Sequence, residues 1–113
     1  MAHKGTSTFI IQRLTAVILI PLIGWFLWSV VAHAGDDIVA TRAWAEKPLN
    51  AVMLGAFISI GAIHMRIGMF EVIQDYVHGS LGSLLKMLNW ALSLLVIGLT
   101  WWSLFEISFT RLF

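Results

Sequence analysis

The sequence predicts an all-α integral membrane protein with three transmembrane helices. Of its 113 residues, 59% are hydrophobic and only 12% are charged, and the mean hydropathy is +0.89. Water-soluble domains average about 25% charged residues, and a small domain buries only part of its apolar surface, so the lipid bilayer is the expected solvent. Three uncharged stretches have about the length needed to cross a hydrocarbon core: Leu14 to Ala34, Pro48 to Met65 and Met87 to Phe105.

The first of these stretches has a competing interpretation. A basic start, an apolar run and the sequence Ala32-His33-Ala34 resemble a signal peptide with its cleavage site. The apolar region of a signal peptide is usually about 7–15 residues long, and this one is longer, so we expect a retained helix. Pro21 is tolerated inside it where a neighbouring helix or side chain satisfies the freed carbonyl group.

Turn and loop signals separate the three expected helices. The segment 35–47 is polar and is expected to be a loop, and Pro48 suits the first turn of the next helix. The helical pattern continues past Arg66, so the second helix is expected to project beyond the hydrocarbon and to end near Gly79. The expected helices cover roughly residues 12–34, 48–77 and 83–106 of one domain, residues 1–113.

Charge and cysteine content exclude several classes of function. The formal net charge of +1 gives no indication of a nucleic-acid partner, and a chain without cysteine has no disulfides or thiolate metal ligands. Three crossings place the N-terminus on the same side as the turn at Gly79. Four lysine and arginine residues flank that side and three flank the other, so the positive-inside rule predicts a cytoplasmic N-terminus.

One stripe of the second helix carries the polar residues expected near membrane depth. Its members recur at steps of four and three residues: His64, Gly68, Glu71, Asp75 and His78. Polar and ionisable groups inside a membrane are costly and are by default candidates for function. This stripe is therefore the candidate functional site.

His64 has two interpretations. A histidine in a membrane bundle can be hydrogen-bonded to a neighbouring helix. A neutral imidazole is also a normal axial ligand of haem iron. Gly61 and Gly68 lie one turn below and above it and leave the clearance that a flat macrocycle needs, although glycines also serve close helix packing.

Cations and the other histidines constrain a haem site. Arg13 and Arg66 lie on the side of the membrane where haem propionates are expected, with snorkelling to the interface as the alternative for Arg66. His33 ends the first helix at a depth about 20 Å from that of His64. The remaining two histidines are in the polar ends, so a second axial histidine would come from another polypeptide.

Asp75 and Tyr76 are candidates for a quinone site at the interface. The Tyr76 phenol donates one hydrogen bond, which suits a quinone carbonyl, and Asp75 is able to hold or relay a proton that quinone reduction consumes. Each also has a structural interpretation, because tyrosine is common at membrane interfaces and an aspartate at a helix end is often solvated. Glu71 has no assignment, and Asn89 is expected to hydrogen-bond across helices.

The spacing of these residues is similar to a known signature. His64-x3-Gly68 followed by Asp75-Tyr76 resembles the hydrophobic membrane-anchor subunit family of succinate dehydrogenase, the succinate:quinone oxidoreductase of respiratory complex II. Three helices, the chain length and the arginine in Phe9-Ile-Ile-Gln-Arg13 are also similar. The specific part of the resemblance is the spacing from the histidine to the aspartate–tyrosine pair.

The resemblance implies a fold, cofactors and partners. It implies half of a six-helix bundle formed with a second membrane anchor subunit, the cytochrome b subunit, with haem b between a histidine from each. His64 matches the axial ligand to the haem iron, Tyr76 with Asp75 matches the ubiquinone site, and Arg13 is similar in position to an arginine near the propionates and the quinone pocket. It also implies an iron–sulfur subunit with iron–sulfur clusters and a flavoprotein subunit that oxidises succinate with FAD.

Three alternatives compete with this interpretation. The anchor of a fumarate reductase or of another quinone-linked dehydrogenase would have the same membrane signature, because redox potentials set the direction of electron flow. A small proton-coupled transporter usually has four helices and a membrane-embedded carboxylate, whereas Glu71 is near the interface. A cofactor-free assembly subunit would give no b-type haem band.

Overall fold

The computed structural model describes the backbone of residues 2–109 and the side chains of residues 6–108, and this part of the chain is helical apart from short connections. Three helices, α1 (Ala2–Ala32), α3 (Pro48–Tyr76) and α4 (Gly79–Phe109), are long and apolar enough to cross a membrane. A short helix, α2 (Ile38–Glu46), connects α1 to α3. The all-α fold with three transmembrane helices is confirmed.

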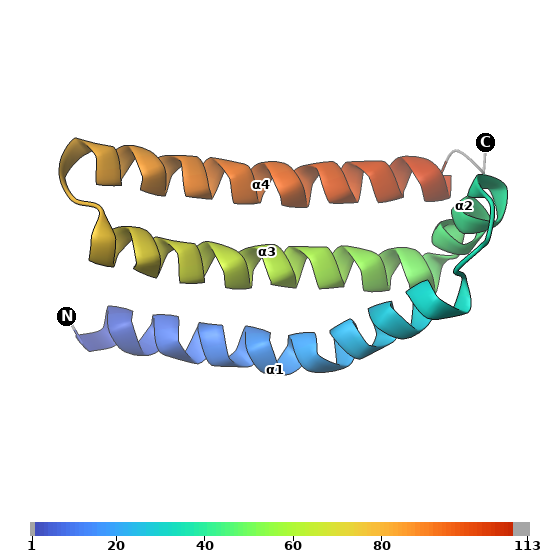
Figure 1. Cartoon of the computed structure of the whole chain (residues 1–113), viewed down its shortest axis with the longest axis horizontal. Coiled ribbons are helices and arrows are strands. Elements are labelled where there is room, and N and C mark those ends of the chain that lie inside the picture. Colours follow the sequence, from blue (N-terminus) through green and yellow to red (C-terminus); the bar gives the residue numbers. More distant parts are fainter. Residues whose placement is uncertain (1, 110–113) are drawn as a thin grey trace.

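The three long helices lie side by side with α3 in the middle (Figure 1). Within the described residues, α1 and α4 both pack against α3, but none of their Cα atoms lie within 8 Å of each other. The N-terminal end of α1 lies at the same end of the molecule as the α3–α4 connection, and α2 lies at the opposite end (Figure 1). The N-terminus and the turn at Gly79 therefore share a side, as three crossings predict.

Two of the long helices begin earlier than their apolar segments. α1 begins at Ala2 rather than near residue 12, and α4 begins at Gly79 rather than near residue 83. Hydrogen bonds within a helix satisfy its backbone whatever the polarity of the side chains, and neither added segment contains a proline to stop the helix. The hydrophobic pattern thus marks the part in lipid and not the whole helix.

The segment 35–47 differs from the expected loop, because α2 occupies most of it. Asp37 is the N-cap of α2, and its side chain accepts a hydrogen bond of 2.8 Å from the main-chain N–H of Ala40. A capping aspartate satisfies one of the free N–H groups at a helix start. Pro48 disfavours helical geometry at Lys47, so α2 ends there and α3 begins with the proline in its first turn.

One bend and one tight turn shape the long helices. α1 changes direction in the part coloured light blue in Figure 1, where it contains Pro21. A proline inside a helix removes one hydrogen bond and crowds the preceding turn, which bends the helix. α3 ends with the Val77 N–H donating to the Ile73 carbonyl at 2.8 Å, and Gly79 then takes a φ of 74°, which glycine adopts without steric cost.

Polar side chains and one indole hold α3 against α4. Asn89 Nδ2 donates to the main-chain oxygen of Arg66 at 2.9 Å, which confirms the expected bond across helices. Trp101 Nε1 donates to Ser59 Oγ at 2.7 Å, and the indole occupies the space that a Cβ at Gly55 would need. Gly55 therefore permits a large side chain of α4 to approach the backbone of α3 closely.

Stacked aromatic rings join α1 to α3 and to α2. Phe26 of α1 stacks on Phe57 of α3 with ring centroids 4.9 Å apart. Trp25 of α1 stacks on Trp44 of α2 at 5.8 Å, and the ring of His33, just after α1, lies 5.6 Å from the same indole. These contacts hold α2 at the end of the molecule opposite the N-terminal end of α1.

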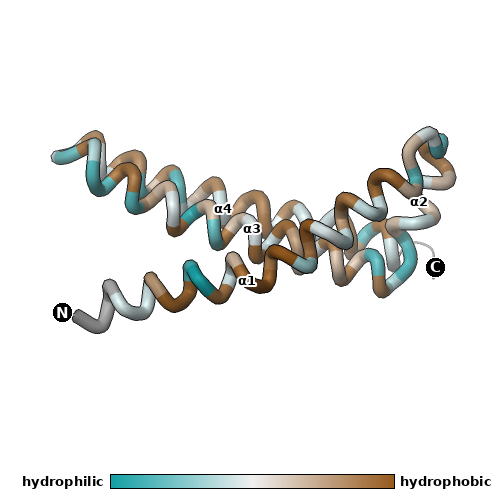
Figure 2. Tube along the Cα trace, turned by 60° about the horizontal axis from the view of Figure 1, so that its bottom comes forward, coloured by the Kyte–Doolittle hydropathy of each residue, from teal (hydrophilic) through white to brown (hydrophobic). Residues whose placement is uncertain are grey.

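Most of the apolar surface lies on the outside of the three helices. Large side chains such as Trp28, Val31 and Trp102 are exposed over 65–74% of their surface. Figure 2 shows hydrophobic colours along the middle of the long helices and hydrophilic colours gathered toward their ends and around α2. Such a surface is stable only against lipid or another apolar protein surface. The buried apolar side chains of the described residues are Leu19, Leu22, Ala51, Ile67, Ile73 and Leu104.

Candidate functional site

His64 lies on α3 and faces α1. Its imidazole is half-buried, and Nδ1 lies 2.9 Å from the hydroxyl oxygen of Thr15. A hydrogen bond across a helix interface, one of the two interpretations of this histidine, is therefore present. It does not exclude the other interpretation, because an imidazole has two ring nitrogens and no described group hydrogen-bonds to Nε2.

The two glycines on the His64 face also lie beside α1. A Cβ built at Gly61 would be 4.0 Å from Leu19 Cδ2, and one at Gly68 would be 3.5 Å from Gln12 Nε2. Both are ordinary van der Waals distances, so alanine would fit against α1 at either position. Packing with α1 alone does not explain the two glycines, and clearance for a haem stays a prediction.

Two polar residues of α1 complete this interface, and neither is among the candidates expected from the sequence. Thr15 contacts His64, and Gln12, one turn earlier, lies beside Gly68. The Gln12 Oε1 atom is buried and has no hydrogen-bond partner in the described part of the chain. Gln12 and Thr15 are three residues apart at the start of the first membrane span, which places both on one face of the helix. This spacing is the sequence signal that identifies them.

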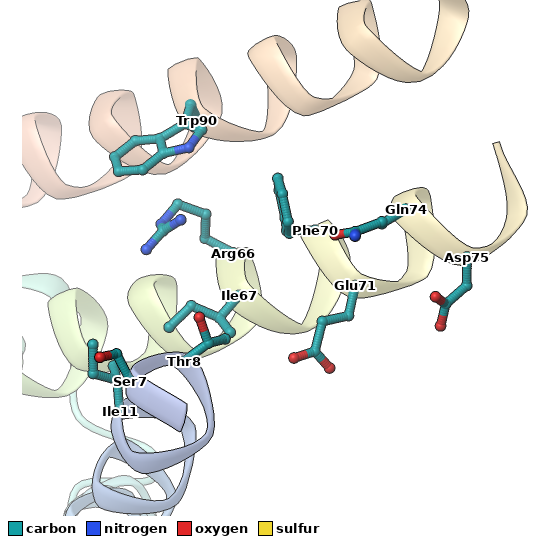
Figure 3. Close-up of a pocket in the computed structure, with 10 residues that line it drawn as sticks. All are labelled: Ser7, Thr8, Ile11, Arg66, Ile67, Phe70, Glu71, Gln74, Asp75 and Trp90. Carbon is teal, nitrogen blue, oxygen red and sulfur yellow. The ribbon is translucent and has the colours of Figure 1, made fainter. Parts of the chain in front are cut away.

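An open groove of about 870 Å³ lies near the N-terminal end of α1, between that helix, α3 and α4 (Figure 3). It is lined by Ser7, Thr8 and Ile11 of α1, by Arg66, Ile67, Phe70, Glu71, Gln74 and Asp75 of α3, and by Trp90 of α4. In Figure 3 the carboxylates of Glu71 and Asp75 lie on the same side of α3, while Arg66 is directed toward Trp90. The groove therefore brings together one cation and two carboxylates.

Arg66 faces α4 and not α1. Its guanidinium carbon lies 4.0 Å from the centroid of the Trp90 ring, which is a cation–π contact. His64 precedes it by two residues and so lies on a different face of α3. The structure therefore gives Arg66 a partner inside this chain, and its contact with a haem propionate stays a prediction.

Asp75 and Tyr76 end α3 and point in different directions. Asp75 lines the groove, whereas Tyr76 does not line it and is 81% exposed. Consecutive residues of a helix are separated by about 100°, which accounts for the difference. A ligand that contacts both side chains would have to lie across the end of α3 and not inside the groove alone.

Arg13 makes its ring contact within α1. It is exposed, and its guanidinium carbon lies 5.1 Å from the centroid of the Phe9 ring. It does not line the groove that contains Arg66 and Asp75. Its predicted place near the propionates or the quinone pocket therefore depends on groups outside this chain.

Metal binding by His64 needs further ligands from elsewhere. Among the side chains of residues 6–108, no cluster of three or more histidine, aspartate or glutamate residues is arranged to hold an ion. His33 is engaged at the opposite end of the molecule, where its Nδ1 lies 2.9 Å from Asp36 Oδ2 and its ring contacts Trp44. A porphyrin and a second axial residue supply the missing ligands in a haem site.

Comparison with known proteins identifies the family. The profile of the succinate dehydrogenase/fumarate reductase transmembrane subunit family matches residues 1–104. The chain belongs to this family. No solved structure matches the chain at a significant level.

Several relatives in this family carry a more specific name. Proteins named succinate dehydrogenase hydrophobic membrane anchor subunit in Rickettsia conorii and Rickettsia prowazekii are each 31% identical over 77 residues, covering 67% and 68% of this chain. A succinate dehydrogenase membrane anchor subunit of Reclinomonas americana is 30% identical over 79 residues, covering 67% of this chain and 66% of the relative. The chain spans 61% and 62% of the length of the two Rickettsia proteins.

Family membership agrees with the fold and with the position of the site. The matched span contains α1, α2, α3 and most of α4, together with every candidate residue from Gln12 to Tyr76. A transmembrane subunit requires long apolar helices with an exposed apolar surface, and the structure has both. The chain is thus a multi-pass membrane member of the succinate dehydrogenase/fumarate reductase transmembrane subunit family.

Proposed function

We propose that the chain is the hydrophobic membrane anchor subunit of a succinate:ubiquinone oxidoreductase. It holds the soluble subunits at an inner membrane, binds one side of a b-type haem through His64 and contributes to the site of ubiquinone reduction. The succinate-oxidising site with FAD belongs to a flavoprotein subunit, and the clusters belong to an iron–sulfur subunit. The observation that carries the proposal is the His64 imidazole, held through Nδ1 while Nε2 has no partner among the described residues.

His64 suits an axial ligand of haem iron. α3 begins at Pro48, so His64 lies roughly 24 Å along the helix and inside the apolar segment. A ligating histidine usually donates its other ring N–H to a protein group, and the Thr15 hydroxyl is such a group. Gly61 and Gly68 on the same face leave room beside the ring. A haem bound there supplies one-electron transfer within the membrane.

The second axial ligand comes from another subunit in this proposal. His33 is engaged with Asp36 at the far end of the molecule, and His78 follows the end of α3, about 20 Å beyond His64. A histidine of a second membrane anchor subunit, the cytochrome b subunit, completes the ligation. The six-helix bundle so formed also covers part of the exposed apolar surface of the three helices.

The ubiquinone site is proposed at the end of α3. The exposed Tyr76 phenol donates a hydrogen bond to a quinone carbonyl, and Asp75, which lines the groove, holds or passes on a proton. Arg13 and Arg66 supply positive charge toward the same end of the molecule, for the haem propionates or for the quinone pocket. This end also contains the N-terminal end of α1, so we place it on the cytoplasmic or matrix side, in agreement with the distribution of flanking lysine and arginine.

A fumarate reductase anchor is the second candidate, because the matched family includes transmembrane subunits of both enzymes. The relatives from Rickettsia and Reclinomonas are named for succinate dehydrogenase, which favours succinate oxidation. The two candidates differ in measurable ways. Purification of the complex, identification of its soluble subunits and its quinone, and comparison of succinate:quinone with quinol:fumarate activity distinguish them.

Substitution of His64 in the purified complex tests the proposed haem ligation. We expect His64→Ala to remove or loosen the b haem. The measurement is the haem absorbance relative to the amount of flavoprotein subunit in the purified complex, and we expect it to fall. His33→Ala is the matched control, because it removes a histidine that is engaged at the opposite end of the molecule. A His64→Ala complex with the same haem content and spectrum as the unmodified complex overturns the proposal.

A further inference from the structure

Thr15 of α1 is the one described residue whose side chain reaches the His64 ring by a hydrogen bond. Its hydroxyl oxygen lies 2.9 Å from His64 Nδ1, 2.9 Å from the Ile11 carbonyl oxygen and 3.0 Å from the Gln12 carbonyl oxygen. The group is half-buried between α1 and α3. Two carbonyl oxygens and one ring nitrogen therefore lie within hydrogen-bond distance of a hydroxyl that has a single proton.

Counting hydrogen bonds decides where that proton goes. If Thr15 donates to the ring, Nδ1 is the acceptor, only one bond forms, and the proton of the neutral imidazole is on Nε2. If Thr15 donates to a carbonyl of its own helix, its oxygen is free to accept from Nδ1–H, and two bonds form. In a membrane interior, where water offers no substitute, the arrangement with two bonds is favoured.

The favoured arrangement determines the tautomer of His64. The ring proton is on Nδ1, and Nε2 keeps its lone pair. Because the two ring nitrogens face away from each other, the bond to Thr15 also directs Nε2 away from α1. The orientation of the ring and the identity of its free nitrogen are thus set by a residue on another helix.

We propose that Thr15 is a positioning residue that holds His64 in the Nε2-ligating tautomer and orients its ring for the haem iron. This inference rests on the proposed role of His64 as an axial ligand. A hydrogen bond accepted from Nδ1–H makes the imidazole a more basic ligand, and a more basic ligand stabilises the ferric state. Thr15 therefore lowers the haem midpoint potential as well as strengthening haem binding.

Substitution of Thr15 in the assembled, purified complex tests the inference. Thr15→Val keeps a similar shape and removes the oxygen, whereas Thr15→Ser keeps the oxygen. We expect Thr15→Val to raise the haem midpoint potential, to shift the electron paramagnetic resonance signal of the ferric haem and to speed haem loss about tenfold. We expect Thr15→Ser to restore the values of the unmodified complex.

Thr100→Val is the matched control for loss of a helix-bound hydroxyl. The Thr100 hydroxyl of α4 donates to the Val96 carbonyl oxygen at 2.7 Å, so it is bonded within its own helix. Like Thr15, Thr100 is half-buried. We expect this variant to keep the midpoint potential and the resonance signal unchanged. If Thr15→Val does not assemble, Thr15→Ala takes its place with the same expected results.

Separate outcomes identify which idea fails. A complex in which His64→Ala removes the haem while Thr15→Val leaves potential, resonance signal and haem loss unchanged overturns the role of Thr15 and keeps the proposed function. A complex in which His64→Ala leaves the haem unaltered overturns both. A shift in Thr15→Val that Thr15→Ser fails to restore also contradicts the inference, because the oxygen would then not be the cause.

Discussion

The guanidinium carbon of Arg66 lies 4.0 Å from the centroid of the Trp90 ring, so a cation–π contact joins α3 to α4 at the groove. Asn89, the residue before Trp90, donates to the main-chain oxygen of the same arginine. Two consecutive residues of α4 therefore hold one residue of α3. This pairing directs the cation toward α4, while the Glu71 and Asp75 carboxylates lie elsewhere along the groove (Figure 3).

Removal of the Trp90 ring is expected to weaken the α3–α4 contact. Trp90→Leu should lower the free energy of unfolding, measured by detergent-induced unfolding in mixed micelles, by about 1–2 kcal/mol. Arg66→Gln should give a similar loss, and the double variant should lose little more than either, because both changes remove the same contact. Trp102→Leu, at a tryptophan that is 65% exposed, is the control with a smaller loss. Fully additive losses would show that the two residues do not interact.

Loss of the Tyr76 hydroxyl is expected to impair quinone reduction and little else. Tyr76→Phe removes one hydrogen bond to the quinone, which is worth roughly a tenfold decrease in succinate:quinone activity. Succinate oxidation by an artificial acceptor that bypasses the membrane should stay largely intact, because it does not use this residue. Haem content should also be unchanged. Full quinone reductase activity in Tyr76→Phe would rule out the proposed role of the phenol.

Addition of a methyl group at Gly55 is expected to disrupt the packing of α4. The new Cβ would overlap the Trp101 indole, so Gly55→Ala should destabilise the chain by about 1–3 kcal/mol through overpacking. Gly98→Ala is the matched control, because nothing lies within 4 Å of a Cβ built there. That variant should be neutral or more stable, since alanine is the better helix former. Equal effects of the two substitutions in the same unfolding assay would show that the indole does not occupy this space.

The membrane class and the number of spans follow from the amino-acid sequence for a simple reason. Hydrocarbon requires long uncharged segments with internally satisfied backbones, and the sequence has three of them, at 14–34, 48–65 and 87–105. The bond from Asn89 across helices follows from the same reasoning, because an amide in lipid needs a partner. The helix α2 does not follow from it, since the Asp37 cap and the contacts of Trp44 matter only for a segment outside the hydrocarbon.

The amino-acid sequence by itself determined the solvent of this chain, its three crossings and the position of His64 along the second of them, because bilayer thickness and helix rise set how many residues a crossing needs. Only the tertiary structure decided which neighbours the polar residues meet. Thr15 meets the His64 ring, and Arg66 turns to Trp90 instead. Those pairings depend on how each helix is rotated against the next, and that rotation is set by side-chain packing between segments far apart in the sequence.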